Sequence, residues 1–327
     1  MQRKNLTIVR YNNNTFLYGF LMKIAIVGIG GVGGYIGAKL CSLIGTQKKK
    51  YEIVFIARGE HAQAVKTNGL RVIEDDGEFI ATPTTVCTAE EAEGTFDLIL
   101  VCVKSYAIKE ALLPLKKNIH PDTVLMPFAN GVNNAETIAN IVDAKVINSC
   151  VYILSHIQAP GVIRKQGNVF AAVFGDPILI GESLFIEYMF KDAGLRTKFT
   201  EDIETAVWKK YLFISAFASL TSFYDISIKK VHDQHYEEAK AVLHEIASVA
   251  KAKGITIEDE IDKALKTASS LPQDASTSMH LDFQHHRKTE LDALTGYIVN
   301  EAKKLQVDVP LMQKIYTTLK ETEGNSK

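Results

Sequence analysis

The sequence predicts an α/β protein in which a doubly wound parallel sheet is followed by an all-helical C-terminal domain. Three observations predict this class. Apolar runs of strand length alternate with helical stretches before residue 200, a glycine-rich turn joins the first such run to the first helix, and helical periodicity alone continues after residue 200. We therefore expect an N-terminal extension at residues 1–21, the sheet domain at 22–199 and the helical domain at 200–327.

The expected elements of the sheet domain begin with an apolar, β-branched run at residues 23–28, which is typical of a buried parallel strand. A helix at 31–44 and a second strand at 52–57 complete one βαβ unit. The alternation then continues, which favours helices on both faces of the sheet. The further expected elements are a short helix at 61–68, a strand within 95–103, an amphipathic helical stretch at 107–117, a strand at 123–127, a helix that follows the turn at 130–131 and ends near 141, and glycine-punctuated strands within 146–180.

Helices are the only elements that we expect after residue 200. Gly254 suits the C′ position that ends the second of these helices, and Pro310 suits the first turn of the last one. The expected helices lie at 202–224, 236–253, 258–269 and 283–305, and from 310 onward.

The composition is that of an ordinary globular protein and excludes several functions. Hydrophobic residues make up 46% of the 327 residues, charged residues 23%, and the formal net charge is −1. Because there is no basic surplus, neither nucleic acid nor a membrane surface is an expected partner. The sequence contains no run of about 18 apolar residues, so no membrane span is expected. Asparagines at 12–14 interrupt the apolar stretch that a secretion signal needs. Four cysteines without a CxxC pattern are expected to be reduced thiols of a cytoplasmic protein.

The glycine-rich turn directly follows the first strand and directly precedes the first helix. It consists of Gly28, Ile29, Gly30, Gly31, Val32 and Gly33, which match the GxGxxG pattern. In a Rossmann-type unit Gly28 allows the tight turn, Gly30 lets a pyrophosphate approach the backbone, and Gly33 lets helix and strand pack closely. The helix N-terminus adds free N–H groups and the positive end of its dipole. The turn therefore predicts a dinucleotide site.

The end of the second strand indicates which dinucleotide to expect. An NAD site usually carries an acid there for the ribose hydroxyls, whereas this strand ends at Arg58. A guanidinium group binds a 2′-phosphate in bidentate fashion, which predicts NADPH or NADP as the cofactor. Two alternatives stay open: Arg58 is a solvated loop residue, or Glu60 contacts the ribose instead.

Five motifs together resemble those of the ketopantoate reductases (2-dehydropantoate 2-reductases). They are MKIAIVGIGGVGGYIGAKL, VCVKSY, FANGV, VWKKY and RKTELDALTG, in order and from Met22 through nearly the whole chain. The resemblance implies an NADPH-dependent reduction of 2-dehydropantoate to pantoate, as in pantothenate and coenzyme A biosynthesis. It also implies a small 2-oxo acid as the partner, a helical domain that closes over a cleft, and a monomer or a homodimer.

The same resemblance implies roles for five polar side chains. Lys210 matches the catalytic lysine of the family, and Glu290 matches its active-site glutamate. Lys104 and Asn130 match cleft residues on the cofactor side, with Asn130 also at the substrate, while Ser278 matches a serine that contacts the substrate. Lys210 and Glu290 are expected to bind the substrate as well. Without the resemblance, Glu290 would be interpreted as a surface carboxylate and Asn130 as a turn residue.

Lys210 also has a chemical argument of its own, because it interrupts an otherwise apolar run. Hydride addition to a ketone builds negative charge on oxygen, and a lysine ammonium group can stabilise that charge and donate the proton. Lys209 is the alternative, and the residues alone do not choose between the two neighbours. Glu290, expected on another helix, could pair with the lysine or bind a substrate hydroxyl.

The helix that carries Lys210 departs from the family pattern at two positions. Family members usually have asparagines four and eight residues after the lysine, whereas this chain has Ile214 and Ala218. An apolar pocket wall is therefore expected beside Lys210. Ser215 and Ser219 lie on a different face of the helix and would not replace the missing amides. Loss of buried polar partners weakens selection for a hydroxylated substrate. Three functions stay open: reduction of 2-dehydropantoate, reduction of a more apolar 2-oxo acid, and NADPH sensing without turnover.

Other residue types with known catalytic or ligand chemistry lack the patterns that would indicate a site. No HExxH or equivalent pattern predicts a metal, and no nucleophile elbow surrounds the serines of the 202–224 helix. We therefore expect no metal and ordinary surface roles for His232, His235, His280, His285 and His286.

Overall fold

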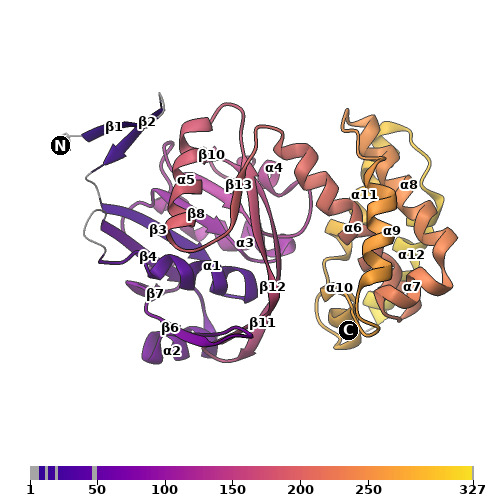
Figure 1. Cartoon of the computed structure of the whole chain (residues 1–327), viewed down its shortest axis with the longest axis horizontal. Helices are drawn as coiled ribbons and strands as arrows, with labels where there is room; N and C mark the ends of the chain where they lie inside the picture. Colours follow the sequence, from indigo (N-terminus) through magenta and orange to yellow (C-terminus); the bar gives the residue numbers. More distant parts are fainter. Residues whose placement is uncertain (1–6, 12–13, 19–20, 46–49, 326–327) are drawn as a thin grey trace. The chain divides into compact units, whose positions relative to one another are not determined.

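The structure is a computed structural model and describes residues 7–11, 14–18, 21–45 and 50–325. The chain forms two compact units, which are treated separately below (Figure 1). The first unit contains Met1–Ala129 and Asn133–Ile203. The second contains Glu204–Lys327 together with the short segment Asn130–Val132. The loop that carries Asn130 therefore groups with the helical residues, which the residue ranges expected from the sequence did not foresee.

The expected N-terminal extension is described in part. Residues 1–6, 12–13 and 19–20 lie outside the described residues. Two short strands, β1 (Thr7–Tyr11) and β2 (Asn14–Tyr18), pair with each other in an antiparallel two-stranded sheet.

Six parallel strands form the central sheet of the first unit. They are β3 (Leu21–Val27), β4 (Lys50–Ile56), β7 (Thr85–Cys87), β8 (Leu98–Val101), β9 (Val124–Pro127) and β10 (Lys145–Val146). Their order across the sheet is β10-β9-β8-β3-β4-β7. The chain first adds strands on one side of β3 and then on the other, so the direction of winding reverses between β3 and β8. Doubly wound sheets bind their ligands at such a switch point, beyond the carboxyl ends of the strands.

Alternate residues of the central strands fill two separate cores, one on each face of the sheet. Ile24 and Ile26 of β3 belong to one core, whereas Ala25 and Val27 belong to the other. The helices of this unit are α1 (Gly31–Cys41), α2 (Gly59–Asn68), α3 (Ile108–Leu112), α4 (Asn134–Ala139) and α5 (Ile180–Asp192). Side chains of α1 and α5 join the first core, and those of α3 and α4 join the second. The predicted doubly wound α/β class is confirmed.

A second sheet of the same unit is built around one long hairpin. β11 (Asn148–Ala159) and β12 (Val162–Gly175) are antiparallel and are joined through Pro160 and Gly161. Three short strands extend the sheet: β5 (Leu70–Ile73), β6 (Glu78–Ala81) and β13 (Thr197–Phe199). The sequence predicted strands within 146–180 but not these shorter ones, because three or four residues show too few alternations to be recognised.

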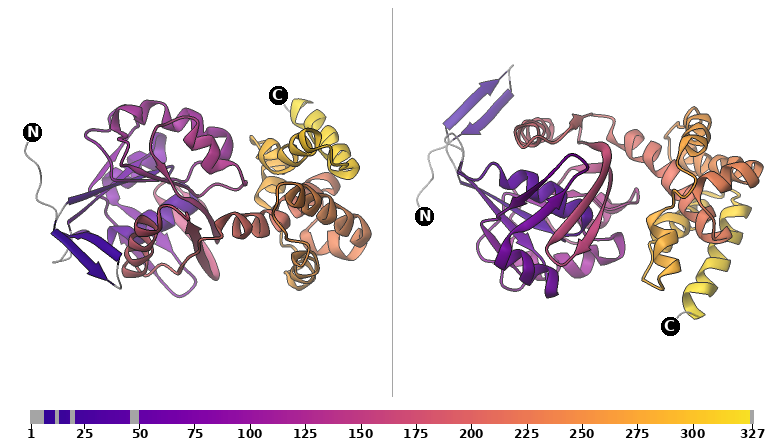
Figure 2. Two further views of the ribbon diagram at one scale, coloured as in Figure 1. Left: turned by 90° about the horizontal axis from the view of Figure 1, so that it is seen from above. Right: turned by 60° about the horizontal axis from the view of Figure 1, so that its bottom comes forward.

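The described residues after 204 contain helices and no strand, as predicted for the C-terminal part (Figure 2). The helices are α6 (Ile203–Tyr224), α7 (Ile228–Gln234), α8 (Tyr236–Ala252), α9 (Glu260–Ser270), α10 (Ser278–Gln284), the π-helical turn η3 (Asp292–Gly296), α11 (Tyr297–Leu305) and α12 (Pro310–Asn325). The buried rings of Trp208 and Tyr211 on α6 pack against Tyr297 of α11. Among the described helices, none alone is long and apolar enough to cross a membrane; α6 and α7 reach that standard only as a pair bent by 81°.

Two expected helices are wrong in their extent. The stretch 107–117 is not one helix, because Pro114 lacks the N–H group that would continue α3 and instead opens the 3-10 turn η2 (Pro114–Asn118). The stretch 283–305 is also interrupted. α10 ends at Gln284, the backbone of His286 is left-handed with φ 52°, and helical structure resumes in the π-turn η3. Glu290 therefore lies in the connection between α10 and η3, not on a helix as expected.

Candidate active site

The glycine turn stands at the switch point of the central sheet, and the backbone explains Gly28 first. Gly28 has φ +92°, a conformation that favours glycine. A Cβ atom there would lie 2.7 Å from Cγ1 of Val103, the second residue after β8. The amide of Gly28 donates to the carbonyl oxygen of Ile56 over 3.0 Å, which ties the turn to the end of β4. A side chain at this position would displace the turn from the ends of the neighbouring strands.

The other glycines of the turn have different neighbouring atoms. Gly30 precedes α1, and no atom lies within 4 Å of the position that its Cβ would take, so its backbone borders open space. At Gly33 a Cβ would overlap the carbonyl oxygen of Gly28, and at Gly31 it would overlap the backbone of Ser155 in β11. Gly31 is thus needed for packing between α1 and the second sheet. Ile29 is buried and Val32 packs against the core, so both contribute hydrophobic contacts.

The first turn of α1 suits an anion. It contains no acidic residue, and its N-terminal amides follow the open backbone at Gly30. The dipole of this helix adds partial positive charge at the same end. A pyrophosphate would therefore meet N–H donors without competition from a carboxylate on this turn.

Arg58 directly precedes α2 and lies just beyond the end of β4. Its side chain is 85% exposed, and Nη1 lies 3.1 Å from Oε1 of Glu110 on α3. An ion pair this exposed contributes little stability, at most about 1 kcal/mol. A phosphate dianion could therefore displace Glu110 at small cost. Glu60, the alternative ribose contact, is exposed in the first turn of α2.

His61 also occupies the first turn of α2, although no sequence motif singled it out. Its Nδ1 accepts a hydrogen bond of 3.0 Å from the amide of Gly161, in the turn between β11 and β12. Burial lowers the pKa of His61 below its ordinary value of 6.5, against smaller opposing effects of the carbonyl groups of Ile29 and Ala159. A ring that accepts through Nδ1 is neutral and carries its proton on Nε2. His61 thus links α2 to the second sheet.

Lys104 lies at the switch point, three residues beyond the end of β8. It is half-buried and follows Val103, the residue that packs on Gly28. The amide of Cys102 donates to the carbonyl oxygen of Val27 over 2.8 Å, which fixes the end of β8 beside the end of β3. Lys104 is therefore placed near the glycine turn by main-chain hydrogen bonds.

In the second unit, three residues that are distant in sequence form one chain of hydrogen bonds. Nζ of Lys210 donates to Oδ1 of Asn130 over 2.9 Å. Nδ2 of the same amide lies 3.5 Å from Oε2 of Glu290 and donates toward it. The Glu290 side chain is buried, with 2% of the residue exposed. The structure thus brings together an ammonium group, an amide and a buried carboxylate, all of which the resemblance had pointed to.

The two neighbouring lysines of α6 have different partners. Nζ of Lys209 lies 2.9 Å from Oε1 of Glu260, the first residue of α9. Glu260 also pairs with Lys263, so Lys209 belongs to a structural ion-pair group. Lys210 faces the side-chain amide of Asn130. This difference favours Lys210 over Lys209 for a role in chemistry.

Two serines of α6 face η3. Ser215 donates to the carbonyl oxygen of Leu294 over 2.9 Å, and Ser219 shares a hydrogen bond of 2.7 Å with Thr295. Both serines are fully buried by these contacts. At the positions where the family usually has asparagines, Ile214 is half-buried and Ala218 is fully buried. The serines therefore cannot supply the polar groups that Ile214 and Ala218 lack.

Ser278 is the remaining candidate and is the first residue of α10. Its side chain is exposed and lies outside the hydrogen-bonded chain of Lys210, Asn130 and Glu290. Thr277, immediately before it, caps the helix by accepting a hydrogen bond from the amide of His280.

Metal and thiol chemistry have no comparable arrangement in the described residues. Among them, no group of three His, Cys, Asp or Glu side chains is placed to hold a metal ion. The four cysteines form no disulfide, and burial raises the pKa of Cys41 to about 12, so that thiol is unreactive.

Comparison with known proteins connects the two units to one family. The family model "Ketopantoate reductase PanE/ApbA" matches residues 24–177, and the model of its C-terminal part matches residues 202–323. The chain belongs to the ketopantoate reductase family. Members of this family are oxidoreductases that act on a CH–OH or C=O group and bind a nicotinamide dinucleotide, so the predicted family, enzyme class and type of cofactor are confirmed.

Individual relatives differ in what is known of them. An uncharacterized oxidoreductase of Bacillus subtilis, YkpB, is 27% identical over 93% of this chain and 99% of its own length. The crystal structure of 2-dehydropantoate 2-reductase from Porphyromonas gingivalis is 30% identical, with a TM-score of 0.81 over 92% of this chain and 99% of that one. A D-mandelate dehydrogenase structure with NADH and anilino(oxo)acetate has a TM-score of 0.84 at 21% identity, over 93% and 99% of the two chains, and shares the fold. The fold alone therefore does not select the substrate.

Proposed function

We propose that this ketopantoate reductase family member reduces 2-dehydropantoate to pantoate with NADPH, the reaction that serves pantothenate and coenzyme A biosynthesis. The observation that carries the proposal is the hydrogen-bonded chain of Lys210, Asn130 and Glu290. A protein that only bound the dinucleotide would have no need of this arrangement. A cytoplasmic location and a homodimer are part of the same proposal.

Lys210 is proposed as the general acid. Reduction of the 2-oxo group leaves an alkoxide, and the ammonium group of Lys210 can stabilise the developing charge and then donate a proton to it. Asn130 accepts one N–H of that ammonium group, which orients the remaining N–H donors. The buried carboxylate of Glu290 accepts from the Asn130 amide and is proposed to bind a substrate hydroxyl.

The first unit is proposed to hold the nicotinamide dinucleotide, which supplies the hydride when bound. Its fit rests on the open backbone at Gly30 and on the first turn of α1, where N–H donors meet no carboxylate of that turn. Gly28 and Gly33 keep the turn tight, and Lys104 is proposed to contact the cofactor at the switch point. Arg58 is proposed to bind the 2′-phosphate of NADPH after leaving Glu110.

A second candidate is the reduction of a more apolar 2-oxo acid. The observation that favours it is the face of α6 beside Lys210, where Ile214 and Ala218 are apolar and Ser215 is hydrogen-bonded to η3. An apolar wall gives a substrate hydroxyl no partner, and selection against acids without a hydroxyl is then weak. Ser278 and Glu290 are the remaining polar groups proposed to contact the substrate.

One assay separates these candidates: loss of NADPH absorbance with a panel of 2-oxo acids. The panel contains 2-dehydropantoate, its branched analogue without the hydroxyl, and an aromatic 2-oxo acid. The highest kcat/KM for 2-dehydropantoate supports the first proposal, whereas a clear preference for either of the others supports the second. No turnover of any member would rule out both and leave NADPH sensing, which a dinucleotide-binding measurement would then test.

A further inference from the structure

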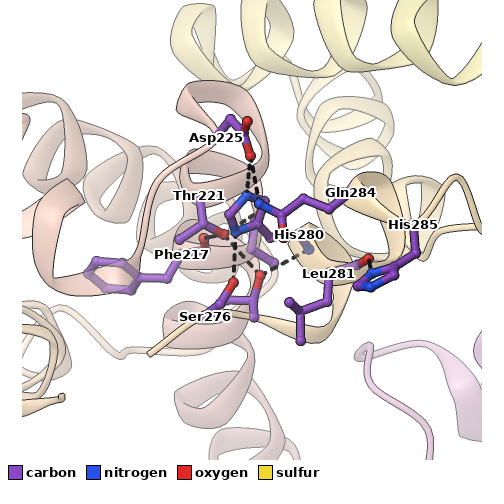
Figure 3. Close-up of polar contacts among 10 residues, drawn as sticks. Phe217, Thr221, Asp225, Ser276, His280, Leu281, Gln284 and His285 are labelled. Carbon is purple, nitrogen blue, oxygen red and sulfur yellow. Dashed lines mark hydrogen bonds and ion pairs between the residues drawn. The ribbon is translucent and has the colours of Figure 1, made fainter. Parts of the chain in front are cut away.

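A buried histidine in the second unit connects the end of α6 with the start of α10 (Figure 3). The surface role expected for His280 from the sequence is wrong: His280 is only 4% exposed, and both ring nitrogens have partners. Nδ1 lies 2.7 Å from the hydroxyl of Ser276, and Nε2 lies 2.7 Å from Oδ1 of Asp225. Gln284 donates to the same aspartate oxygen over 2.9 Å. The result is a linear series of hydrogen bonds from Ser276 through His280 to Asp225.

The direction of these hydrogen bonds follows from their chemistry. Hydrogen bonds from His280 and Gln284 lower the pKa of the Asp225 carboxyl group, so it is ionised near neutral pH and can only accept. Nε2 of His280 must then carry a proton. In the neutral ring, Nδ1 accepts the proton of the Ser276 hydroxyl. Each side chain in the series thus has a defined donor or acceptor role.

Asp225 adopts a backbone conformation that its side-chain contacts help to explain. It directly follows α6 and has φ 52°, a left-handed value that glycine adopts more readily than any other residue. The backbone alone would therefore favour glycine here. The carboxylate that aspartate adds accepts the hydrogen bonds from His280 and Gln284.

Two further hydrogen bonds fix the same connection. The hydroxyl groups of Thr221 on α6 and Thr277 are 2.9 Å apart, and both residues are buried. The amide of Ile228, the first residue of α7, donates to the carbonyl oxygen of Ala275 over 2.9 Å. The three successive residues before α10 are therefore each held: Ala275 by α7, Ser276 through His280 by Asp225, and Thr277 by α6.

The next residue in the chain is Ser278. We propose that Asp225 and His280 are positioning residues, which hold the first turn of α10 against α6 so that Ser278 meets the substrate of Lys210. This inference rests on the proposed function, in which Ser278 contacts the 2-oxo acid. Because α6 carries both Lys210 and Thr221, the same helix sets the proton donor and the start of α10.

A nucleophilic triad is not what the arrangement provides, although the residue types are those of one. In serine hydrolases the nucleophile is bonded to Nε2 and a buried aspartate to Nδ1. Here Ser276 is bonded to Nδ1 from four residues before the histidine, and the Asp225 side chain on Nε2 is 74% exposed. The geometry favours bracing of a turn over activation of a hydroxyl group.

The test compares Asp225→Gly with Asp225→Asn in the full-length protein. Glycine suits the left-handed backbone but removes the carboxylate, whereas asparagine tolerates that backbone and keeps an acceptor. His285→Ala is the matched control, because His285 directly follows α10, is exposed, and its ring contacts the carbonyl oxygen of Leu281 rather than Asp225 or Ser276. The measurements are the thermal midpoint, hydrogen exchange of the amides from 276 to 281, KM and kcat for the 2-oxo acid, and Kd for NADPH.

We expect Asp225→Gly to speed exchange at the start of α10 and to raise KM about tenfold, since fewer molecules present Ser278 correctly. The thermal midpoint, kcat and NADPH binding should change little, and Asp225→Asn and His285→Ala should resemble the wild type. Unchanged exchange in Asp225→Gly would overturn the bracing role. Faster exchange with an unchanged KM would overturn the role in substrate binding. Absence of turnover in the wild type would instead reject the proposed function, and the substrate role of Ser278 would be rejected with it.

Discussion

At the scale of single residues, the adjacent lysines of α6 give a controlled test of the proton donor. Lys210→Ala should lower kcat by about 10²-fold to 10⁴-fold, the usual contribution of a general acid, with NADPH binding little changed. Lys209→Ala removes the ion pair with Glu260 on α9 and should leave kcat close to that of the wild type. Steady-state kinetics of both variants show which lysine is the proton donor. An equal loss of kcat in Lys209→Ala would contradict the assignment of Lys210 as the proton donor.

Arg58 allows a second test at this scale, on the choice of dinucleotide. Arg58→Ala should reduce the preference for NADPH over NADH about tenfold or more, because a charge-assisted contact to the 2′-phosphate is lost. Glu110→Gln removes the carboxylate that pairs with Arg58 and should keep or increase the preference. The ratio of kcat/KM values for the two dinucleotides is the measurement. A ratio that does not change in Arg58→Ala would exclude Arg58 from the cofactor site.

The sequence could propose these residues but could not describe their partners. The glycine pattern pointed to Gly28, and the resemblance to the family motifs pointed to Lys210 and Glu290. The residues alone did not choose between Lys210 and Lys209, and the family pattern selected Lys210. The physical difference between the two lysines lies in their partners Asn130 and Glu260, which are distant in the chain. Hydrogen bonds between distant residues leave no local pattern in the sequence, and the same is true of His61 and His280.

At the scale of secondary structure, two adjacent glycines of one turn should respond in opposite ways. Gly31→Ala would overlap the backbone of Ser155 and should destabilise the protein by about 1–3 kcal/mol, although alanine normally favours a helix. Gly30→Ala meets no protein atom, so it should leave the stability unchanged and weaken dinucleotide binding. Thermal unfolding and dinucleotide titration separate the two effects. A stable Gly31→Ala variant would contradict the close packing of α1 on β11.

The elements that the sequence located well are those with strong periodicity and clear ends. β3, α1, β4 and α8 belong to this group, and Gly254 ends α8 in the left-handed conformation expected of it. The failures have physical causes. Proline divides the stretch at 107–117, and the π-turn η3 forms where its carbonyl groups accept from Tyr211 and Ser215 of α6, a tertiary interaction. No local propensity predicts a helix of that kind.

At the scale of the whole molecule, several ionisable groups should make the protein less stable in acid. Burial raises the pKa of Glu301, but hydrogen bonds from Lys253 and Lys304 outweigh it and leave the pKa below 4.5. The same balance, with Lys39 and Tyr35 as donors, lowers the pKa of Glu74. A carboxyl group with a lowered pKa stabilises the fold above its unfolded pKa, and this stabilisation is lost as the pH falls through the folded value. These two carboxylates therefore affect the stability only below about pH 4.5.

His61 should make the protein sensitive to acid at a higher pH than these carboxylates do. Its pKa is lowered from 6.5 in the folded state, so the unfolded chain binds more protons as the pH falls below 6.5. Stability due to the neutral ring is thus complete above that value and is lost below it. Protonation would also place a proton on Nδ1, which accepts from Gly161.

Thermal midpoints of the wild type and His61→Gln, measured from about pH 7.5 to about pH 5, test this sign. Glutamine keeps a side-chain acceptor for Gly161 and does not titrate. The variant should be less stable than the wild type at the upper pH, because its acceptor is less well placed. The difference should shrink as the pH falls, since only the wild type loses stability through this group. A difference that stays constant or grows toward acid would show that the folded-state pKa of His61 is not lowered, and that its link between α2 and the second sheet does not depend on a neutral ring.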